Sequence, residues 1–339
     1  MNNLTVEEVF EAYYECRKSK RYSYGALSFE ANYEENLLEL YTELKNQTWK
    51  CGKSTCFIVN EPVKREIFAA PFRDRIVHHI LMNRLNPYFE KYFINDSYAC
   101  RTGKGTHAAI QRAAHFVRSV SCNNTKEVVF NDVCKDCMIR SPLKEWDGQP
   151  EDKSLFTAKS FCGLPIGNLT SQVFANFYLS EFDHFIKHTL KIKNYVRYVD
   201  DFIIVHEDKK YLKNLIPVIR RFLKNKLLVI LHPKKIFLQN AKKGFQYLGC
   251  FIKPEFITVN KRIRKNFTES LKIYSLIAKA NKPSNEIFEN MLASFNSYLG
   301  IMVHYKAWKF KTKQIKYYFE PYLKKHFSVK LLCDKVERA

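Results

Sequence analysis

The chain has 339 residues, of which 46% are hydrophobic, and this supply of apolar side chains excludes a wholly disordered protein. Its 56 Lys and Arg residues against 34 Asp and Glu residues give a formal net charge of +22, so we expect a polyanionic partner such as nucleic acid or an anionic membrane surface. Aromatic residues make up 15% of the chain and suit base stacking, although a basic protein with an aromatic core would have the same composition.

The N-terminus and the cysteines predict a cytoplasmic protein without a membrane partner. The first 15 residues are polar and acidic and lack the apolar core of a signal peptide, and no apolar run approaches the length of a membrane span. The ten cysteines are scattered, which is typical of reduced thiols. Cys134 and Cys137 have the spacing of two metal ligands, but no second pair accompanies them, so we interpret them as ordinary thiols.

The first part of the chain reads as helices around one hairpin. Apolar residues at helical spacing predict helices over 6–16, 32–44 and 73–85. Between the last two, strand-like runs at 56–60 and 67–70 flank a basic turn, which predicts a β-hairpin. Residues 121–160 contain many Cys, Asn, Asp, Lys, Ser, Gly and Pro and only one short apolar run, so we expect this stretch to be rich in loops.

The second part of the chain alternates between helical and strand-like patterns. The sequence predicts a long helix over 171–190, strands at 195–199 and 202–206, a helix over 211–226, and strands at 227–232 and 244–252. From residue 261 to the end the pattern is helical, and the net charge of that stretch alone is +11. So one-sided a balance favours a surface that cradles nucleic acid over a simply solvated helix face.

The stretch from Tyr195 to His206 carries the strongest chemical signal. β-formers run into two adjacent carboxylates, Asp200 and Asp201, and further β-formers follow, which predicts a hairpin with both acids at its tip. Asp is a common turn residue, but Asp-Asp is not a favoured two-residue hairpin turn, and adjacent carboxylates repel each other unless a cation lies nearby. Two Mg²⁺ ions beside a nucleic acid would explain the pair, one activating a 3′-hydroxyl and the other steadying the leaving pyrophosphate.

The same hairpin resembles the YxDD box of reverse transcriptases, here Tyr198-Val199-Asp200-Asp201. Four other stretches resemble that family's two fingers motifs, its nucleotide-pocket motif and its primer grip, in the same order: 64–75, 98–105, 163–172 and 244–249. The Ile-Gly-x-x-x-Ser-Gln form at 166–172 is similar to that of reverse transcriptases from diversity-generating retroelements, which are related to those of group II introns.

This resemblance implies an α+β fold with the fingers and palm of a right-hand polymerase and a C-terminal helical thumb. We expect an N-terminal helical segment over 1–54, fingers and palm over 55–255, and a basic thumb over 256–339. The implied activity is RNA-directed DNA polymerisation that makes cDNA for mutagenic retrohoming. The implied partners are template RNA, cDNA, dNTPs and a small basic accessory protein.

The resemblance also implies roles for particular residues. Asp200 and Asp201 would bind two Mg²⁺ ions, while Tyr247 and Gly249 would belong to the primer grip. The residues expected to contact the nucleotide or the template are Lys64, Arg65, Arg73, Arg101, Gly167 and Gln172. The four cations of this set lie on or near predicted turns, where they suit phosphate groups.

One expected residue does not match the family's pattern. The family has a further metal-binding aspartate between its second fingers motif and position 163, followed by two aromatic residues, and no stretch here shows that pattern. Asp132, after the apolar run 128–130, is the nearest candidate, and we interpret the mismatch as a deleted segment near 121–127. The alternative is a degenerate relative that binds RNA without polymerising. A generic basic scaffold would leave five ordered motifs as coincidence.

Overall fold

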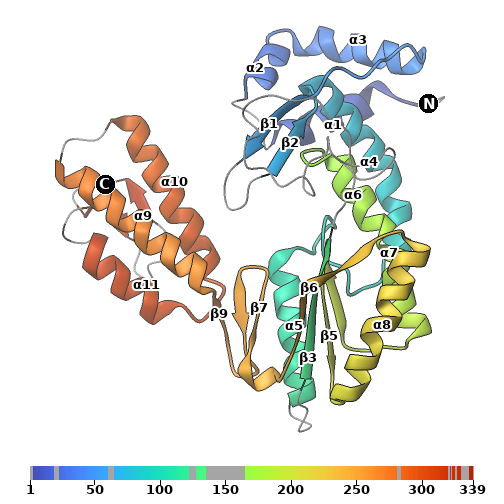
Figure 1. The fold of residues 1–339 in the computed structure, drawn as a ribbon. Coiled ribbons are helices and arrows are strands. Elements are labelled where there is room, and N and C mark those ends of the chain that lie inside the picture. The colour runs from blue at the N-terminus through green and yellow to red at the C-terminus, as the bar shows by residue number, and fades with distance from the viewer. Residues whose placement is uncertain are drawn as a thin grey trace.

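In the computed structural model, most of the chain is described, and it folds into antiparallel sheets with helices packed on them. The described residues are 3–18, 23–59, 65–121, 127–134, 165–280 and 284–319, with 321, 323–324, 327–329 and 336–338 near the C-terminus. Every pairing between the named strands is antiparallel, and the C-terminal helices form a lobe beside the largest sheet (Figure 1). The predicted α+β class is confirmed.

Four helices form the N-terminal end of the molecule. They are α1 (Val6–Arg17), α2 (Tyr24–Glu30), α3 (Tyr33–Lys45) and the long helix α4 (Phe72–Tyr92). α1 begins with a capping box in which the side chains of Thr5 and Glu8 each accept from the other's main-chain N–H. One buried apolar cluster joins all four helices, through Val9, Phe29, Leu40 and Ile76 among others. The predicted helices are therefore confirmed, and α4 is longer than predicted.

The hairpin predicted before α4 is also confirmed. Strands β1 (Thr55–Val59) and β2 (Arg65–Ala69) pair in antiparallel register from Thr55↔Ala69 to Val59↔Arg65. The basic turn between them, including Lys64, lies outside the described residues. β2 also meets a distant part of the chain, because the Phe68 N–H donates to the Ile166 carbonyl at 2.7 Å.

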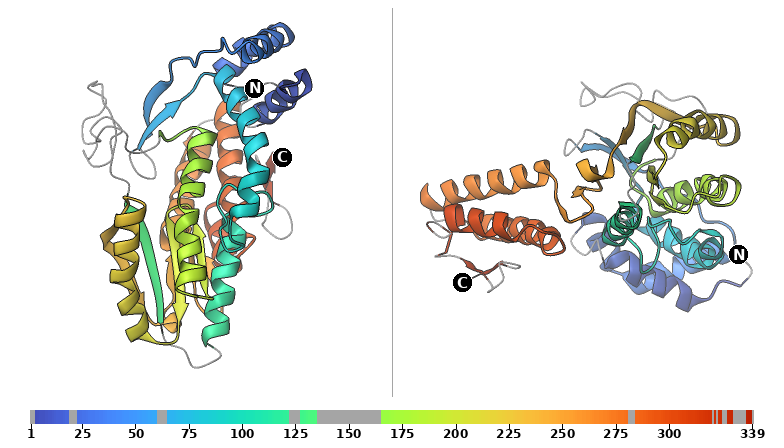
Figure 2. Two further views of the ribbon diagram at one scale, coloured as in Figure 1. Left: turned by 90° about the vertical axis from the view of Figure 1, so that its right-hand side faces the viewer. Right: turned by 90° about the horizontal axis from the view of Figure 1, so that it is seen from below.

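A four-stranded sheet in the order β4-β5-β3-β6 forms the centre of the molecule. Its strands are β3 (Glu127–Cys134), β4 (Tyr195–Tyr198), β5 (Asp201–His206) and β6 (Ile230–Gln239). Because neighbouring residues of a strand face opposite ways, Ile203 and Val205 pack with α5 (Thr106–Ser121), whereas Phe202 and Ile204 pack with α7 (Ser180–His184) and α8 (Lys209–Lys226). Figure 2 shows α5 and α8 on opposite sides of the sheet.

The expectation that 121–160 is rich in loops is wrong for one segment. β3 is an eight-residue strand that pairs with β5 on one side and β6 on the other. Local pattern reading missed it, because the pairing that stabilises it joins segments about 70 to 110 residues apart in the sequence. Cys134 ends this strand, while Cys137 and the rest of 135–164 lie outside the described residues.

A helical run leads from the chain's centre into the β4–β5 hairpin. It consists of α6 (Leu169–Tyr178), α7 and the π-helix η3 (Phe185–Thr189), and it confirms the helix predicted over 171–190. α6 packs against α4, between the β1–β2 hairpin and the four-stranded sheet (Figure 1). The run therefore connects the end of the molecule that carries the β1–β2 hairpin to the central sheet.

The C-terminal part begins with a small sheet and continues as helices. The elements are η4 (Ala241–Lys243), β7 (Phe245–Tyr247), β8 (Cys250–Ile252), β9 (Ile257–Val259), α9 (Lys261–Ala280), α10 (Asn285–Met302), α11 (Trp308–Gln314), η5 (Ile315–Phe319), β10 (Phe327–Val329) and β11 (Val336–Arg338). The single strand expected over 244–252 is a hairpin that turns at Leu248 and Gly249, both with positive φ. Within the described ranges, no helix is both long and apolar enough to cross a bilayer.

Candidate active site at the β4–β5 turn

The hairpin that carries the two adjacent aspartates is confirmed, but its tip differs from the prediction. β4 and β5 pair from Tyr195↔Ile204 to Tyr198↔Asp201, so the turn consists of Val199 and Asp200. Asp201 is the first residue of β5, not a turn residue. The sequence pattern predicted both acids at the tip. A two-residue loop suits the twist of paired strands, and the pairing therefore extends to Asp201. The two carboxylates stand on a turn residue and a strand residue.

The turn contains a strained residue. Val199 has φ +55°, a conformation that L-residues adopt at a cost of roughly 1–2 kcal/mol and that β-branched residues rarely adopt at all. Primed hairpin turns require a positive φ at this first central position, which Gly or Asn would normally supply. The strain must therefore be offset by contacts around the turn.

Arg197, two residues before the turn's first residue, makes such a contact from inside the protein. Its side chain is 1% exposed, and its Nη1 donates to the Val199 carbonyl at 2.8 Å. A hydrogen bond from a charged donor contributes about 1.5–3 kcal/mol, enough to offset the strain of the Val199 backbone. The turn is thus held by a buried guanidinium.

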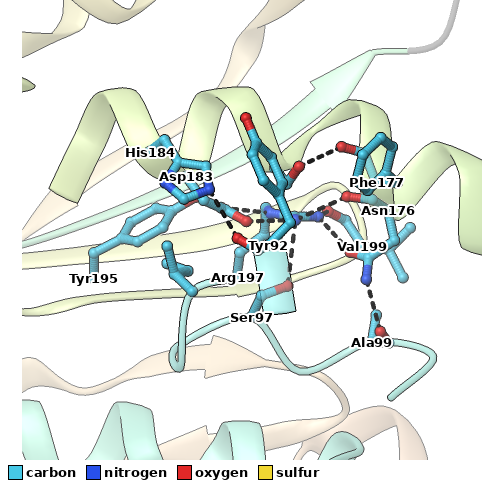
Figure 3. Close-up of polar contacts among 12 residues, drawn as sticks. Tyr92, Ser97, Ala99, Asn176, Phe177, Asp183, His184, Tyr195, Arg197 and Val199 are labelled. Atoms are coloured by element: carbon cyan, nitrogen blue, oxygen red, sulfur yellow. Dashed lines mark hydrogen bonds and ion pairs between the residues drawn. The ribbon is translucent and has the colours of Figure 1, made fainter. Parts of the chain in front are cut away.

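The rest of the guanidinium binds a buried polar cluster drawn from three other segments (Figure 3). Nε and Nη2 donate to the two carboxylate oxygens of Asp183 at 2.7 and 2.6 Å, and the Asp183 side chain is fully buried. Nη1 also donates to Asn176 Oδ1 at 2.7 Å, and Nη2 to Ser97 Oγ at 3.3 Å. α6, α7 and the segment before residue 98 therefore converge on one side chain of β4.

The charges of this cluster are fixed by their surroundings. Burial by itself lowers the pKa of Arg197, but the Asp183 carboxylate more than compensates, and the pKa lies above its usual value. Burial, and then the charge of Asp183, raise the pKa of Tyr195 well above its usual value. The Tyr195 hydroxyl therefore keeps its proton, which it donates to Asp183 Oδ1 at 2.6 Å.

The main chain of Arg197 is anchored as firmly as its side chain. Its N–H donates to the Asp96 carbonyl at 3.0 Å, and its own carbonyl accepts from the Tyr98 N–H at 3.0 Å. Asp96 is in turn held by Arg112 and Lys187, both at 2.7 Å. The stretch resembling the second fingers motif, 98–105, thus begins at the side of β4.

Asp201 lies near a buried tyrosine of the small sheet. Tyr247 in β7 is 1% exposed, and burial, followed by the charge of Asp201, raises its pKa well above the usual value. The assignment of Tyr247 to a primer grip stays a prediction, because the structure places this side chain in the core. Gly249 lies in the β7–β8 turn with φ +85°, a conformation that favours glycine.

Asp132 lies in β3, the strand next to β5. The register runs from Glu127↔His206 to Asn131↔Phe202, so the backbone of Asp132 follows at the end of the sheet where Asp201 begins β5. The β3–β6 pairing shifts register between Asn131 and Val133, an irregularity common next to active sites. The role of Asp132 as a metal ligand stays a prediction, as does the deletion near 121–127.

The predicted phosphate-binding cations differ in how free their side chains are. Arg101 is only 7% exposed and donates to Glu90 at 2.7 Å and to the Ile94 and Ser97 carbonyls at 2.6 and 2.9 Å. Its guanidinium therefore fixes the 94–101 loop. Arg73 forms an ion pair with Glu43 at 2.8 Å, whereas Arg65 is exposed at the start of β2. Phosphate binding by these residues stays a prediction, and Arg65 is the most accessible of the three.

Gly167 and Gln172 lie where α6 meets β2 and the 98–105 stretch. Gly167 has φ +125°, and a Cβ there would lie 2.7 Å from the Phe68 carbonyl oxygen, so only glycine fits against β2. Gln172 is exposed on α6, and its Oε1 lies 3.7 Å from the Cys100 thiol. The structure thus brings the nucleotide-pocket motif beside both stretches that resemble fingers motifs.

Pattern reading missed the residues that hold the turn, above all Arg197 and Asp183. A signal was available, because Arg197 stands in an apolar strand pattern between Val196 and Tyr198. A charged residue in a buried strand needs a partner, since burying an unpaired charge is costly. The partner itself could not be named, because Asp183, Asn176 and Ser97 are 14, 21 and 100 residues away in the sequence.

More than half of the chain matches a known protein family. The model of a family described as reverse transcriptase (RNA-dependent DNA polymerase) matches residues 63–252, which is 190 of the 339 residues. No curated protein matches the sequence significantly. Among solved structures, telomerase from Candida albicans, determined with a fragment of telomeric RNA, matches at 12% identity with a TM-score of 0.40. That match covers 86% of this chain and 65% of the telomerase chain.

Proposed function

The chain belongs to the reverse transcriptase family of RNA-dependent DNA polymerases, and on this premise we propose that it copies a template RNA into cDNA at the β4–β5 turn. The observation that carries the proposal is the placement of Asp200 and Asp201 at the end of a hairpin that Arg197 holds from inside. Adjacent carboxylates at the end of a rigid hairpin repel each other unless cations lie between or beside them. Such a turn suits metal-dependent nucleotidyl transfer better than a purely structural role.

Two Mg²⁺ ions fit the donor chemistry of this end of the sheet. Asp200 and Asp201 offer oxygen ligands, which Mg²⁺ prefers, and Asp132 would add a third carboxylate from the neighbouring strand. The part of the chain whose side chains are described contains no group of three His, Cys, Asp or Glu residues that could hold a metal, and the proposal takes its third carboxylate from Asp132. When bound, the metals would activate the primer 3′-hydroxyl and steady the leaving pyrophosphate.

The chain's own residues would align the substrates. The turn fixes where the two acids stand relative to β3, and Gln172 on α6 would present its amide to the incoming nucleotide. Gly167 supports this position because its backbone packs directly on β2. Holding reactants in a productive geometry is among the largest contributions an enzyme makes.

The template would lie along the basic C-terminal helices. α9 carries exposed cations at Lys261, Arg262, Lys265 and Lys272. Neutralising phosphates with such residues releases counterions, so binding should weaken steeply as salt rises. The form of residues 166–172 further supports a diversity-generating retroelement type, with mutagenic retrohoming and a small basic accessory protein as parts of the proposal.

Primer extension on an RNA template tests the activity. We expect the wild type to synthesise DNA with Mg²⁺, and Asp200→Asn and Asp201→Asn each to lose about a thousandfold or more in rate, as several kcal/mol of metal-dependent stabilisation disappear. Asp208→Asn is the matched control, because Asp208 is an exposed cap of α8 at the far end of β5 and asparagine can still cap. Extension by the two active-site variants at the wild-type rate would exclude the proposal.

The same assay decides the role of Asp132 and the alternative function. Asp132→Asn should match the loss in Asp200→Asn if both bind the metals, and RNA affinity should not change. A wild-type protein that binds RNA but makes no DNA under these conditions would identify the degenerate, RNA-binding relative.

A further inference from the structure

We propose that Arg197 is a positioning residue for the catalytic turn, which its guanidinium holds through the Val199 carbonyl so that Asp200 and Asp201 keep one arrangement. The inference rests on the proposed function, because it states how that site is held. It assigns to Arg197 a role in the reaction that does not require contact with a substrate or a metal.

The two edges of the guanidinium have separate tasks. Nε and Nη2 face Asp183 and form a bidentate ion pair, which fixes the plane of the group. Nη1 points the other way and donates to Val199 and Asn176. Because the guanidinium is planar and rigid, the position of Asp183 on α7 sets the position of the Val199 carbonyl in the turn.

The buried ion pair alone does not explain the arrangement. Apolar side chains of similar volume often serve a protein core as well as or better than a buried ion pair, so stability gives little reason for an arginine at this position. An apolar side chain could not replace the hydrogen bonds to Asn176, Ser97 and Val199, and only the bond to the Val199 carbonyl reaches the turn, where Val199 has a φ of +55°. The arginine is therefore best explained by what it does to the turn.

The same cluster links the turn to the proposed nucleotide pocket. Asn176, which accepts from Arg197, donates through Nδ2 to the Ala99 carbonyl at 2.8 Å, within the 98–105 stretch. Asn176 lies on α6, four residues after Gln172. A displacement of α6 or of residues 97–99 would therefore reach the turn through Arg197.

Arg197→Lys separates positioning from the ion pair. A lysine keeps a charge for Asp183, but one ammonium cannot also reach the Val199 carbonyl with the geometry of the fork. We expect kcat for DNA synthesis to fall about ten- to hundredfold, as for the loss of one charged hydrogen bond, and the Mg²⁺ concentration for half-maximal rate to rise. RNA affinity and KM for the dNTP should change little.

Arg84→Lys is a matched control. Arg84 donates through Nε and Nη2 to Glu8 at 2.9 and 2.7 Å and through Nη2 to the Asn3 carbonyl at 2.8 Å, so it makes the same kind of fork in the N-terminal helices. It has no contact with the hairpin. We expect neither kcat nor the Mg²⁺ requirement to change in this variant.

Hydrogen exchange provides a measurement that does not depend on activity. In folded Arg197→Lys, the peptide spanning 195–206 should exchange faster at the turn, whereas Arg84→Lys should leave this peptide unchanged. Asn176→Ala, which removes the second acceptor of Nη1 and keeps the ion pair, should shift kcat and exchange in the same direction by a smaller factor. If Arg197→Lys does not fold, the Asn176→Ala variant provides the test in its place.

The outcomes distinguish this inference from the proposed function. Wild-type synthesis together with unchanged kcat, Mg²⁺ requirement and turn exchange in Arg197→Lys would overturn the inference and leave the function standing. Absence of synthesis by the wild type would overturn the function, and turn exchange would then decide the positioning role alone. A loss of thermal stability with unchanged turn exchange would identify Arg197 as structural only.

Discussion

The central sheet and the N-terminal helices each contain an arginine fork with the same chemistry and a different setting. Arg197 and Arg84 both hold a carboxylate with two nitrogens and a main-chain carbonyl with one. The side chains of Arg197 and Asp183 are 1% and 0% exposed, whereas those of Arg84 and Glu8 are each 34% exposed. Equal geometry therefore has unequal consequences, because water can replace a lost partner only at the N-terminal fork.

The two carboxylates also have different second duties. Asp183 accepts a hydrogen bond from the buried hydroxyl of Tyr195, so the central fork is closed to solvent on both sides. Glu8 accepts from the Thr5 N–H and completes the capping box of α1. One carboxylate organises the support of the β4–β5 turn, and the other starts a helix. The comparison predicts that breaking the central fork lowers the stability of the whole central region. Breaking the N-terminal fork should have only a small, local effect.

Neutralising each carboxylate should show the largest difference between the regions. Asp183→Asn leaves a buried guanidinium without a counter-charge, and we expect the free energy of unfolding to fall by about 3–5 kcal/mol. Glu8→Gln breaks a pair that water reaches, with both side chains 34% exposed, and should cost about 0–1 kcal/mol. Urea unfolding of the two variants measures both values. Equal losses would show that burial does not separate the forks.

A substitution where the β1–β2 hairpin meets α6 should cause the next largest loss in the free energy of unfolding. Gly167→Ala would bring a Cβ to 2.7 Å from the Phe68 carbonyl at a φ of +125°, so backbone strain and a clash with main chain add up. We expect a cost of about 3 kcal/mol, since each effect is worth about 1–3 kcal/mol. Gly103→Ala is the control, because Gly103 has φ +69° but open space around its Cβ position, and should cost only about 1 kcal/mol.

Removing one hydroxyl tests whether Tyr195 belongs to the central cluster energetically. Tyr195→Phe leaves Asp183 with one donor fewer in a buried site, and we expect a loss of about 1–2 kcal/mol in the free energy of unfolding. Tyr33→Phe removes a hydroxyl that donates to Glu34 at the surface and should change stability by a few tenths of a kcal/mol at most. A loss in Tyr33→Phe as large as that in Tyr195→Phe would contradict the comparison.

Much of the fold could be predicted because its signals are local. Sequence patterns located three of the four N-terminal helices, the β1–β2 hairpin and the β4–β5 hairpin, since each depends on residues close together in the sequence. The short helix α2 was not predicted. β3 was missed because its partners, β5 and β6, are distant and its one apolar run, 128–130, is short. A strand in the middle of a sheet is specified by its neighbours as much as by its residues.

The candidate site divides in the same way. Asp200 and Asp201 stand out from the β-formers around them, so the sequence was enough to find the hairpin that carries them. The turn residues were assigned one position too late, because cross-strand register decides which residue pairs last. Arg101 was expected to face phosphate, yet its acceptors are an acid and two carbonyls of its own loop. Whether a cation points inward depends on tertiary packing, which no local pattern records.

The smallest expected effect separates the two regions by their response to acid. The hydrogen bonds from Arg84 lower the pKa of Glu8, so the unfolded chain binds this proton more readily than the folded protein does as the pH falls. The stability that the pair contributes is therefore complete above the ordinary pKa of a glutamate and is lost as the pH falls through the lowered value. We expect the difference in unfolding free energy between the wild type and Glu8→Gln, at most about 1 kcal/mol at pH 6, to shrink as the pH is lowered from 6 to 3.

The corresponding difference for Tyr195→Phe should stay constant over that range. Burial raises the pKa of Tyr195, so its hydroxyl is protonated in both the folded and the unfolded protein at every pH from 3 to 6, and its contribution is lost only as the pH rises above the ordinary value of a tyrosine. Urea unfolding of the wild type and both variants at pH 3, 4, 5 and 6 measures the two differences side by side. A Glu8→Gln difference that does not shrink between pH 6 and pH 3 would mean that the charge pair with Arg84 is not what Glu8 contributes to the N-terminal helices.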